Sequence, residues 1–68
     1  MYLTIVKKQY WKFNNLDKAI EKADNQLEPA WVIDGCSADV GSRSITLKEG
    51  ANPVHSNLYA LIWEKDNK

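Results

Sequence analysis

Residues 57–64 read Asn-Leu-Tyr-Ala-Leu-Ile-Trp-Glu and contain the longest uninterrupted apolar run of the 68-residue chain. Successive side chains of a β-strand point to opposite faces, so as a strand this segment is apolar on both faces. The two rows are Leu58, Ala60 and Ile62 on one face, and Tyr59, Leu61 and Trp63 on the other. A strand of this kind is typical of the middle of a sheet, where other layers cover both faces. We therefore predict that residues 57–64 form a central strand and that the rest of the chain covers it.

A helix is the competing interpretation of this segment. Ser56 is a suitable N-cap, and the residues at 58, 61, 62 and 65 fall at helical spacing. The strand is favoured because Tyr, Leu, Ile and Trp lie together in a short run that follows a loop containing proline.

Three other segments have the composition of strands. Residues 2–6 (Tyr-Leu-Thr-Ile-Val) are rich in β-formers, and residues 30–34 (Ala-Trp-Val-Ile-Asp) lead into an Asp-Gly turn. Residues 43–48 alternate between apolar and polar side chains, which is typical of a half-buried strand antiparallel to its neighbour. Residues 36–42 fit either a short return strand or an open loop. Residues 49–56 contain Gly, Asn and Pro and are predicted to be a loop.

Residues 15–28 have the pattern of an amphipathic helix. Asn14 or Asn15 is a suitable N-cap, and Pro29 ends the helix at or before Glu28. Apolar residues recur at helical spacing, and the opposite face is charged. The apolar positions are Leu16, Ala19, Ile20, Ala23 and Leu27. This narrow stripe with two alanines indicates a helix that packs closely against a sheet.

Together these elements predict one domain that spans residues 1–68. The fold class is α+β in the order β-α-β-β-β, with a largely antiparallel sheet of about four strands and the helix of residues 15–28 packed on one face. A domain of this size buries only about 60% of its extended-chain surface, so its stability is marginal. Cys36 is the only cysteine, which excludes a disulfide within the chain, and Cys36 with His55 is too small a ligand set for structural zinc. Close packing or self-association must therefore stabilise the domain.

The composition narrows the functional classes. Nine basic residues balance nine acidic ones, so no overall charge attracts the chain to nucleic acid or to an anionic membrane. The sequence has no secretion signal, and no apolar run approaches the roughly 18 residues of a membrane span. A lone thiol fits a reducing compartment, so we expect a cytoplasmic protein with no membrane partner.

No residue set in the sequence predicts catalysis. There is no phosphate-binding glycine motif, no metal-ligand spacing, and no sign of a cofactor or a small-molecule substrate. Cys36 is predicted to follow a turn and His55 to lie in a separate exposed loop, so neither is expected to activate the other. We predict that the chain is not an enzyme. Its small size and its Asn, Lys and Trp content resemble those of small bacterial or phage accessory proteins, although no motif carries that resemblance.

The predicted sheet has more apolar surface than one narrow helix covers. The row of the last strand that the helix leaves uncovered is expected to face solvent, and contiguous apolar patches of this kind mark interfaces. The alternative is that loops and long polar side chains cover this face. We predict a non-enzymatic interaction protein that binds itself, as a homodimer, or another protein through an aromatic sheet face or edge. The candidate interface residues are Trp31, Tyr59, Leu61 and Trp63.

A basic and aromatic segment supports a second prediction, binding to nucleic acid. Bases stack on aromatic rings and phosphates pair with lysines in proteins that bind single strands. The alternative is that the rings close the core where strand meets helix, while the lysines are solvated. The zero net charge argues against a dedicated nucleic-acid-binding protein. The candidate residues are Lys7, Lys8, Tyr10, Trp11 and Lys12.

Overall fold

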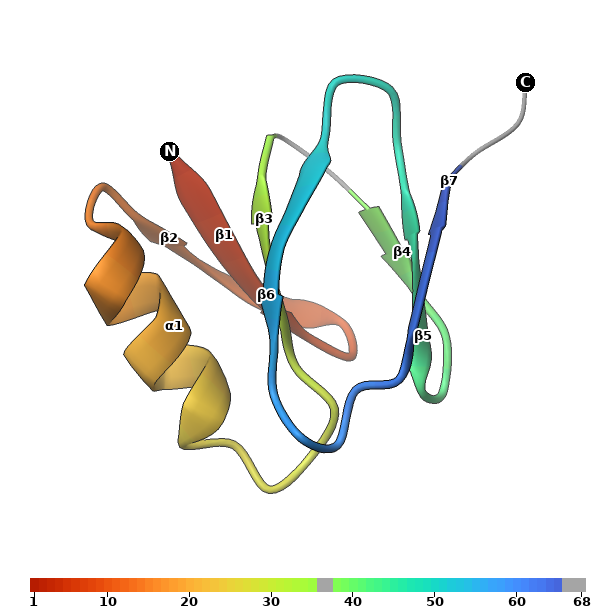
Figure 1. Cartoon of the computed structure of the whole chain (residues 1–68), viewed down its shortest axis with the longest axis horizontal. Helices are drawn as coiled ribbons and strands as arrows, with labels where there is room; N and C mark the ends of the chain where they lie inside the picture. Colours follow the sequence, from red (N-terminus) through yellow and green to blue (C-terminus); the bar gives the residue numbers. More distant parts are fainter. Residues whose placement is uncertain (36–37, 66–68) are drawn as a thin grey trace.

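A four-stranded antiparallel sheet lies between a helix on one face and a three-stranded sheet on the other (Figure 1). This computed structural model describes residues 1–35 and 38–65. The elements are β1 (Tyr2–Val6), β2 (Gln9–Phe13), α1 (Leu16–Asp24), β3 (Trp31–Asp34), β4 (Ala38–Val40), β5 (Ser44–Leu47), β6 (Asn52–Ser56) and β7 (Ile62–Lys65). The first sheet has the order β2-β1-β3-β6, which confirms the predicted α+β class with a helix on one face of an antiparallel sheet.

Strand β3 is the central strand of the molecule. It pairs with β1 on one side and with β6 on the other, and its residues Trp31, Val32 and Ile33 are completely buried. Val32 packs on the helix side of the sheet, whereas Trp31 and Ile33 pack against the second sheet. The continuous apolar run of β3 follows from this burial on both faces.

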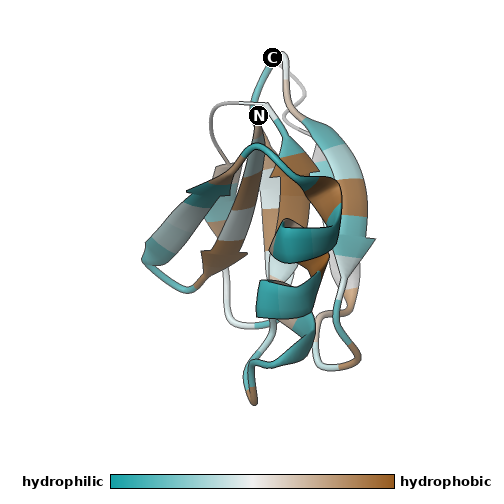
Figure 2. Cartoon of the chain, turned by 90° about the vertical axis from the view of Figure 1, so that its left-hand side faces the viewer, coloured by the Kyte–Doolittle hydropathy of each residue, from teal (hydrophilic) through white to brown (hydrophobic). Residues whose placement is uncertain are grey.

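The helix is placed by its cap and by its small residues. The side chain of Asn15 accepts a hydrogen bond from the backbone N–H of Lys18 at 3.2 Å, which fixes the N-terminus. Ala19 and Ala23 are fully buried, so the helix approaches the sheet closely enough for the Thr4 hydroxyl to donate to the Ala19 carbonyl at 2.8 Å. Figure 2 shows the mainly hydrophilic helix lying across strands that carry apolar segments. The helix ends at Asp24, before the predicted limit at Glu28.

The prediction of a central strand at residues 57–64 is wrong. Residues 57–61 form a turn and its exit, and only the last part of the run joins β7, an edge strand that pairs in parallel with β5. The Asn57 side chain causes the turn, because its Oδ1 accepts the backbone N–H groups of Tyr59 and Ala60. Leu58 is consequently 81% exposed rather than buried. The alternation of apolar residues carries no information about such a side-chain-to-backbone turn.

The loop predicted at residues 49–56 contains a strand, β6, at the edge of the four-stranded sheet. Pro53 is compatible with this position because an edge strand leaves one side of its backbone unpaired. A register shift opposite Val32 and Ile33 accommodates the irregularity. Strand β2 was also not predicted, because its connection to β1 through Lys7 and Lys8 lacks the usual turn residues.

The sequence predicted that the sheet face away from the helix is exposed to solvent, and this prediction is wrong. The three-stranded sheet, β4-β5-β7, covers it from within the same chain. Ile45 and Leu47 of β5 and Ala60 pack on Leu3 and Ile33 of the first sheet. Residues 36–42, for which strand and loop were both open, contribute β4 over 38–40, and β4 pairs with β5 instead of returning along β3.

The side-chain amide of Asn57 joins the end of the helix to the connection before β3 and to the turn after β6. The residue is 6% exposed, and both polar atoms of its side chain are hydrogen-bonded. Its Oδ1 accepts from the backbone N–H groups of Ala30, Tyr59 and Ala60, each at 3.1 Å. Its Nδ2 donates to the carbonyl oxygens of Ala23 at 3.0 Å and Glu28 at 2.8 Å. Asn57 therefore fixes the chain entry into β3 and the chain exit from β6 together.

We expect Asn57→Ala to lower the free energy of unfolding by about 3 kcal/mol, because it leaves several buried backbone groups without partners. The measurement is urea denaturation followed by far-UV circular dichroism. Asn14→Ala, at an exposed position, is the matched control and should change stability by no more than about 0.5 kcal/mol. Equal effects of the two substitutions would contradict the role given to Asn57.

Candidate binding cleft at the open edge of the sheets

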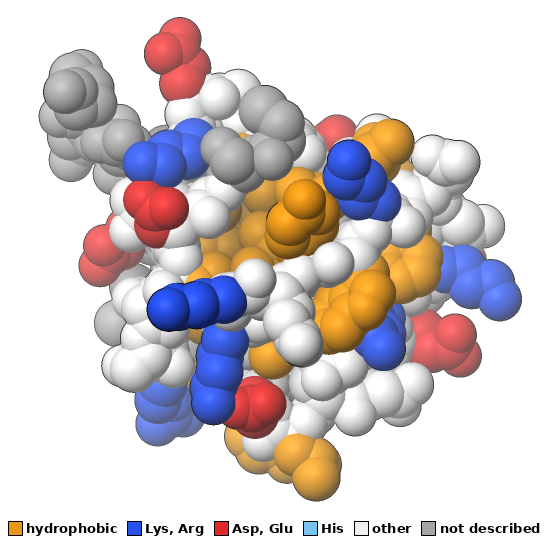
Figure 3. Space-filling model, turned by 180° about the vertical axis from the view of Figure 1, so that it is seen from behind, with side chains coloured by type: hydrophobic (Ala, Val, Ile, Leu, Met, Phe, Trp, Pro, Cys, Tyr) orange, Lys and Arg blue, Asp and Glu red, His pale blue; other side chains and the backbone are white. Residues whose placement is uncertain are grey.

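The two sheets separate at one side of the molecule and leave a cleft of about 730 Å³ between the β1–β2 hairpin and β4. The buried layer between the sheets includes residues of β1 and β3 but none of β2. The second sheet therefore covers the first sheet only as far as β1, and the β2 surface beyond it stays open. Figure 3 shows apolar side chains gathered in the middle of this face, with lysine or arginine side chains around them.

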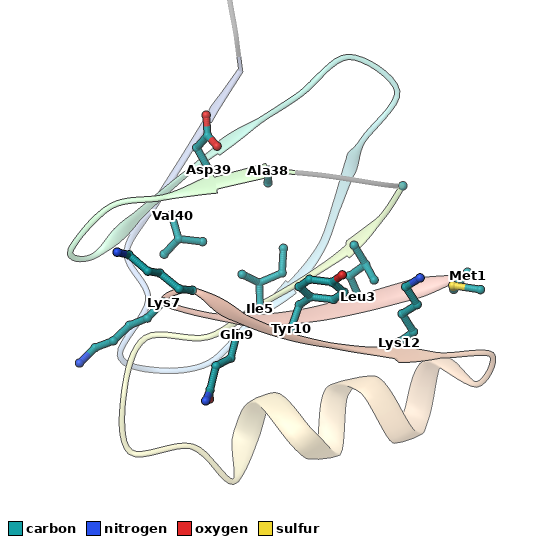
Figure 4. A pocket seen from close by; sticks show the side chains of 12 residues that line it. Met1, Leu3, Ile5, Lys7, Gln9, Tyr10, Lys12, Ala38, Asp39 and Val40 are labelled. Carbon is teal, nitrogen blue, oxygen red and sulfur yellow. The ribbon is translucent and has the colours of Figure 1, made fainter.

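The apolar floor of the cleft follows from strand register. Ile5 pairs with Tyr10 and Leu3 pairs with Lys12, and directly opposed residues of two strands share a face. In Figure 4 the side chains of Ile5, Leu3 and Tyr10 rise from the hairpin toward β4, and Val40 points down toward them. Tyr10 is 58% exposed, so its ring forms an open apolar wall of the cleft.

The charge around the cleft is positive. Among the described lining residues the charged ones are Lys7, Lys8, Lys12 and Asp39. The carboxylate of Asp39 pairs with Lys48 at 2.9 Å, and Lys7 pairs with Glu28. Within the described part of the chain, Lys8 and Lys12 have no ion-pair partner, and both are exposed. An occupant of the cleft therefore meets two unneutralised ammonium groups at its rim.

The hairpin turn at Lys7 and Lys8 extends the cleft. A second hollow of about 680 Å³ shares Lys7, Lys8, Gln9 and Val40 with the first and also borders Gly41 and Ser42 in the β4–β5 connection. Lys7 adopts a φ of 53°, a left-handed conformation that costs a residue with a Cβ about 1 kcal/mol. The two hollows adjoin at these shared residues along the open side of the molecule.

The residues of the predicted nucleic-acid segment lie on two faces of β2. Tyr10 and Lys12 line the cleft, as do Lys7 and Lys8 of the turn. Trp11 points to the opposite face, where it packs with the helix-side core and lies 4.4 Å beneath the ammonium group of Lys22. The structure thus brings together four of the five predicted residues and separates Trp11 from them.

The four predicted interface residues do not form one surface. Trp31 is 0% exposed and belongs to the core, so it cannot anchor a partner on the surface of this structure. Trp63 packs against the same core from β7. Tyr59 is half-buried in the turn before β7, and its carbonyl accepts from Arg43 at 3.3 Å. Leu61 is 59% exposed, and among the four it is the one with an open side chain.

Of the two residues considered for catalysis, the structure places His55 differently from the prediction. His55 lies in β6 instead of an exposed loop, and its Nε2 is 2.8 Å from a carboxylate oxygen of Asp24 at the helix end. Cys36 lies outside the described residues. Within those residues, no cluster of three or more His, Cys, Asp or Glu side chains is arranged to hold a metal ion. No helix in the described part of the chain has the length and apolarity needed to cross a membrane.

Several cleft residues were not identified from the sequence. Leu3 and Ile5 were placed on one face of the first strand, but their position in a cleft depends on β2, which was not predicted, and on β4, whose segment fitted both strand and loop. Val40 carried no signal, because it lies in a segment that fitted both strand and loop.

The chain has no match in three comparisons with known proteins: no family model, no curated protein and no solved structure matches it. Function must therefore be argued from the site itself. The cleft combines an apolar floor, an exposed ring, two unpaired cations and the backbone of two edge strands. These groups are suited to holding a chain molecule by burial, charge and backbone hydrogen bonds.

Two substitutions on neighbouring residues of β2 test the assignment of its faces. Tyr10→Thr should change the free energy of unfolding by no more than about 0.5 kcal/mol, because the ring is largely exposed. Trp11→Thr should lower it by about 2 kcal/mol, because it removes a half-buried ring from the helix-side core. Threonine keeps the β-propensity of both positions, and chemical denaturation gives both values. A larger loss at Tyr10 than at Trp11 would mean that the faces are reversed.

Proposed function

We propose that this chain is a non-enzymatic interaction protein that binds another polypeptide in the cleft between β2 and β4. The observation that carries the proposal is the open side of the two-sheet layer, where apolar side chains of β1 and β4 lie beside an uncovered edge strand. The second sheet covers β1 and β3 of the first sheet, and its buried layer includes no residue of β2. The remaining opening is a natural place for a partner to add apolar contacts.

The backbone supports the same proposal. β2 and β4 are each paired on one side, so each presents unpaired N–H and C=O groups along its free edge. An extended segment of a partner can add to such an edge, with main-chain hydrogen bonds for affinity and pockets for alternate side chains. Because both edges border one cleft, a partner meets backbone and apolar groups together.

The proposal is tested by affinity capture from the native host with matched surface variants. Wild type and Lys18→Glu, which changes an exposed helix residue on the other side of the sheet, should retain the same partner. Tyr10→Asp combined with Lys12→Glu should lose it, by at least about tenfold in recovery after the partner is purified and remixed. Folding of each variant is checked by circular dichroism. Retention of the partner by the cleft variant would rule out the cleft as the binding site.

Self-association is a separate outcome of the same work. Sedimentation equilibrium of the purified chain gives its mass in solution against the 7.8 kDa of one copy. A dimer that dissociates in the Tyr10→Asp and Lys12→Glu variant would make a second copy the partner. A dimer that survives this change would place self-association elsewhere on the molecule.

A second candidate function, binding of single-stranded nucleic acid, is favoured by one observation. The exposed ring of Tyr10 lies on the same face of β2 as Lys12 and near the Lys7–Lys8 turn, as stacking and phosphate pairing require. Of the two predicted stacking rings, only Tyr10 is available to a base in the cleft, because Trp11 faces the helix. A labelled oligothymidylate should then bind at low salt, weaken steeply as salt rises, and lose about tenfold affinity in Tyr10→Thr. Absence of binding at low salt would remove this function.

A further inference from the structure

We infer that the occupant of the cleft is an extended, acidic segment of another protein that adds as a strand to the free edge of β2; this inference rests on the proposed function.

The availability of an edge depends on its length and regularity. The described part of the chain has four strand edges, on β2, β6, β4 and β7. β6 contains Pro53 and a register shift, both of which hinder pairing with another strand. β4 has three residues and β7 has four, whereas β2 has five residues in unbroken register with β1. β2 is therefore the longest regular edge that a strand can join.

The charge on β2 discriminates between possible strands. Lys12 lies within the strand and Lys8 immediately precedes it, and neither has an ion-pair partner among the described residues. Antiparallel pairing of β2 with β2 of a second copy would bring four such lysines to one seam, and like charges across strands oppose pairing. A strand that carries carboxylates would be attracted by the same lysines that repel a second copy of β2. The same two lysines therefore disfavour self-pairing and favour an acidic partner.

The register predicts the order of side chains in the partner. Tyr10 and Lys12 are two residues apart on the cleft face of β2, and Lys8, in the turn that precedes the strand, also lines the cleft. An added strand directs every second side chain to the cleft side of the sheet. Side chains near Lys12 and Lys8 should be acidic, and the side chain between them should be apolar, because it would lie beside the exposed ring of Tyr10 at the open side of the cleft. The pattern is acidic-x-apolar-x-acidic.

The experiment uses the full chain and three labelled peptides that differ at two positions. The first peptide contains Asp-Thr-Leu-Thr-Glu between neutral flanks, the second replaces both acids with Ser, and the third replaces both with Lys. Affinity is measured by fluorescence anisotropy, and the site by amide chemical shifts of the ¹⁵N-labelled chain. The acidic peptide should bind at least about fivefold more tightly than the Ser peptide, consistent with two exposed charge pairs. The Lys peptide should bind more weakly than both.

Variants of the chain locate the charges. Lys8→Ala combined with Lys12→Ala should reduce the affinity for the acidic peptide by about fivefold and leave that for the Ser peptide unchanged. Lys18→Ala on the helix should have no effect. Amides of β2 should shift, and they should become protected from hydrogen exchange, while those of β6 should not.

The outcomes separate this inference from the proposed function. Equal affinities of the acidic and Ser peptides, with shifts at β2, would overturn the acidic requirement and leave a binding cleft. Absence of any β2 response to all three peptides would overturn strand addition. The proposed function would then be tested by the capture experiment alone, in which the wild type retains the partner and the cleft variant loses it. Displacement of the acidic peptide by oligothymidylate, with tighter binding of the latter, would assign the cleft to nucleic acid instead.

Discussion

Burial of β3 on both faces is the constraint on which the rest of the structure depends. Trp31, Val32 and Ile33 are sealed completely, which requires a layer on each side of the sheet and a paired strand on each edge of β3. The helix provides one layer with two alanines that permit close approach, and the second sheet provides the other with the apolar row of β5. In a chain of 68 residues, nearly every element is used to cover this strand.

The layers are joined by a small number of polar contacts in the loops. Asn57 connects the end of the helix, the entry to β3 and the turn before β7 through one amide group. His55 and Asp24 add a contact between β6 and the helix end. Asn57 bonds to backbone groups and His55 to one side chain, so each contact fixes the position of the loop or strand end that it joins.

The cleft is a consequence of the unequal width of the layers. The second sheet has short strands, and its coverage ends at β1, so the outer strand β2 has one face open and one edge unpaired. At the same place the residues facing the opening change from buried Ile5 and Leu3 to exposed Tyr10 and Lys12. Apolar floor, ring, cations and free backbone therefore coincide at β2.

The amino-acid sequence determined the local elements whose signals are contained within a few residues. The strand at residues 2–6, the helix capped by Asn15 and the strand that contains Trp31 were all predictable, because their periodicity and capping residues act locally. Tertiary structure decided which segments became strands despite poor local signals: β2 follows a turn of two lysines, and β6 contains a proline that only an edge position accepts. It also decided that residues 57–61 turn instead of extending. The Asn57 amide closes the turn locally, and its further bonds to backbone groups of Ala23, Glu28 and Ala30, distant in sequence, hold it in a buried position. The cleft belongs to this second class, since its two walls come from strands that are neighbours only after the sheets have packed.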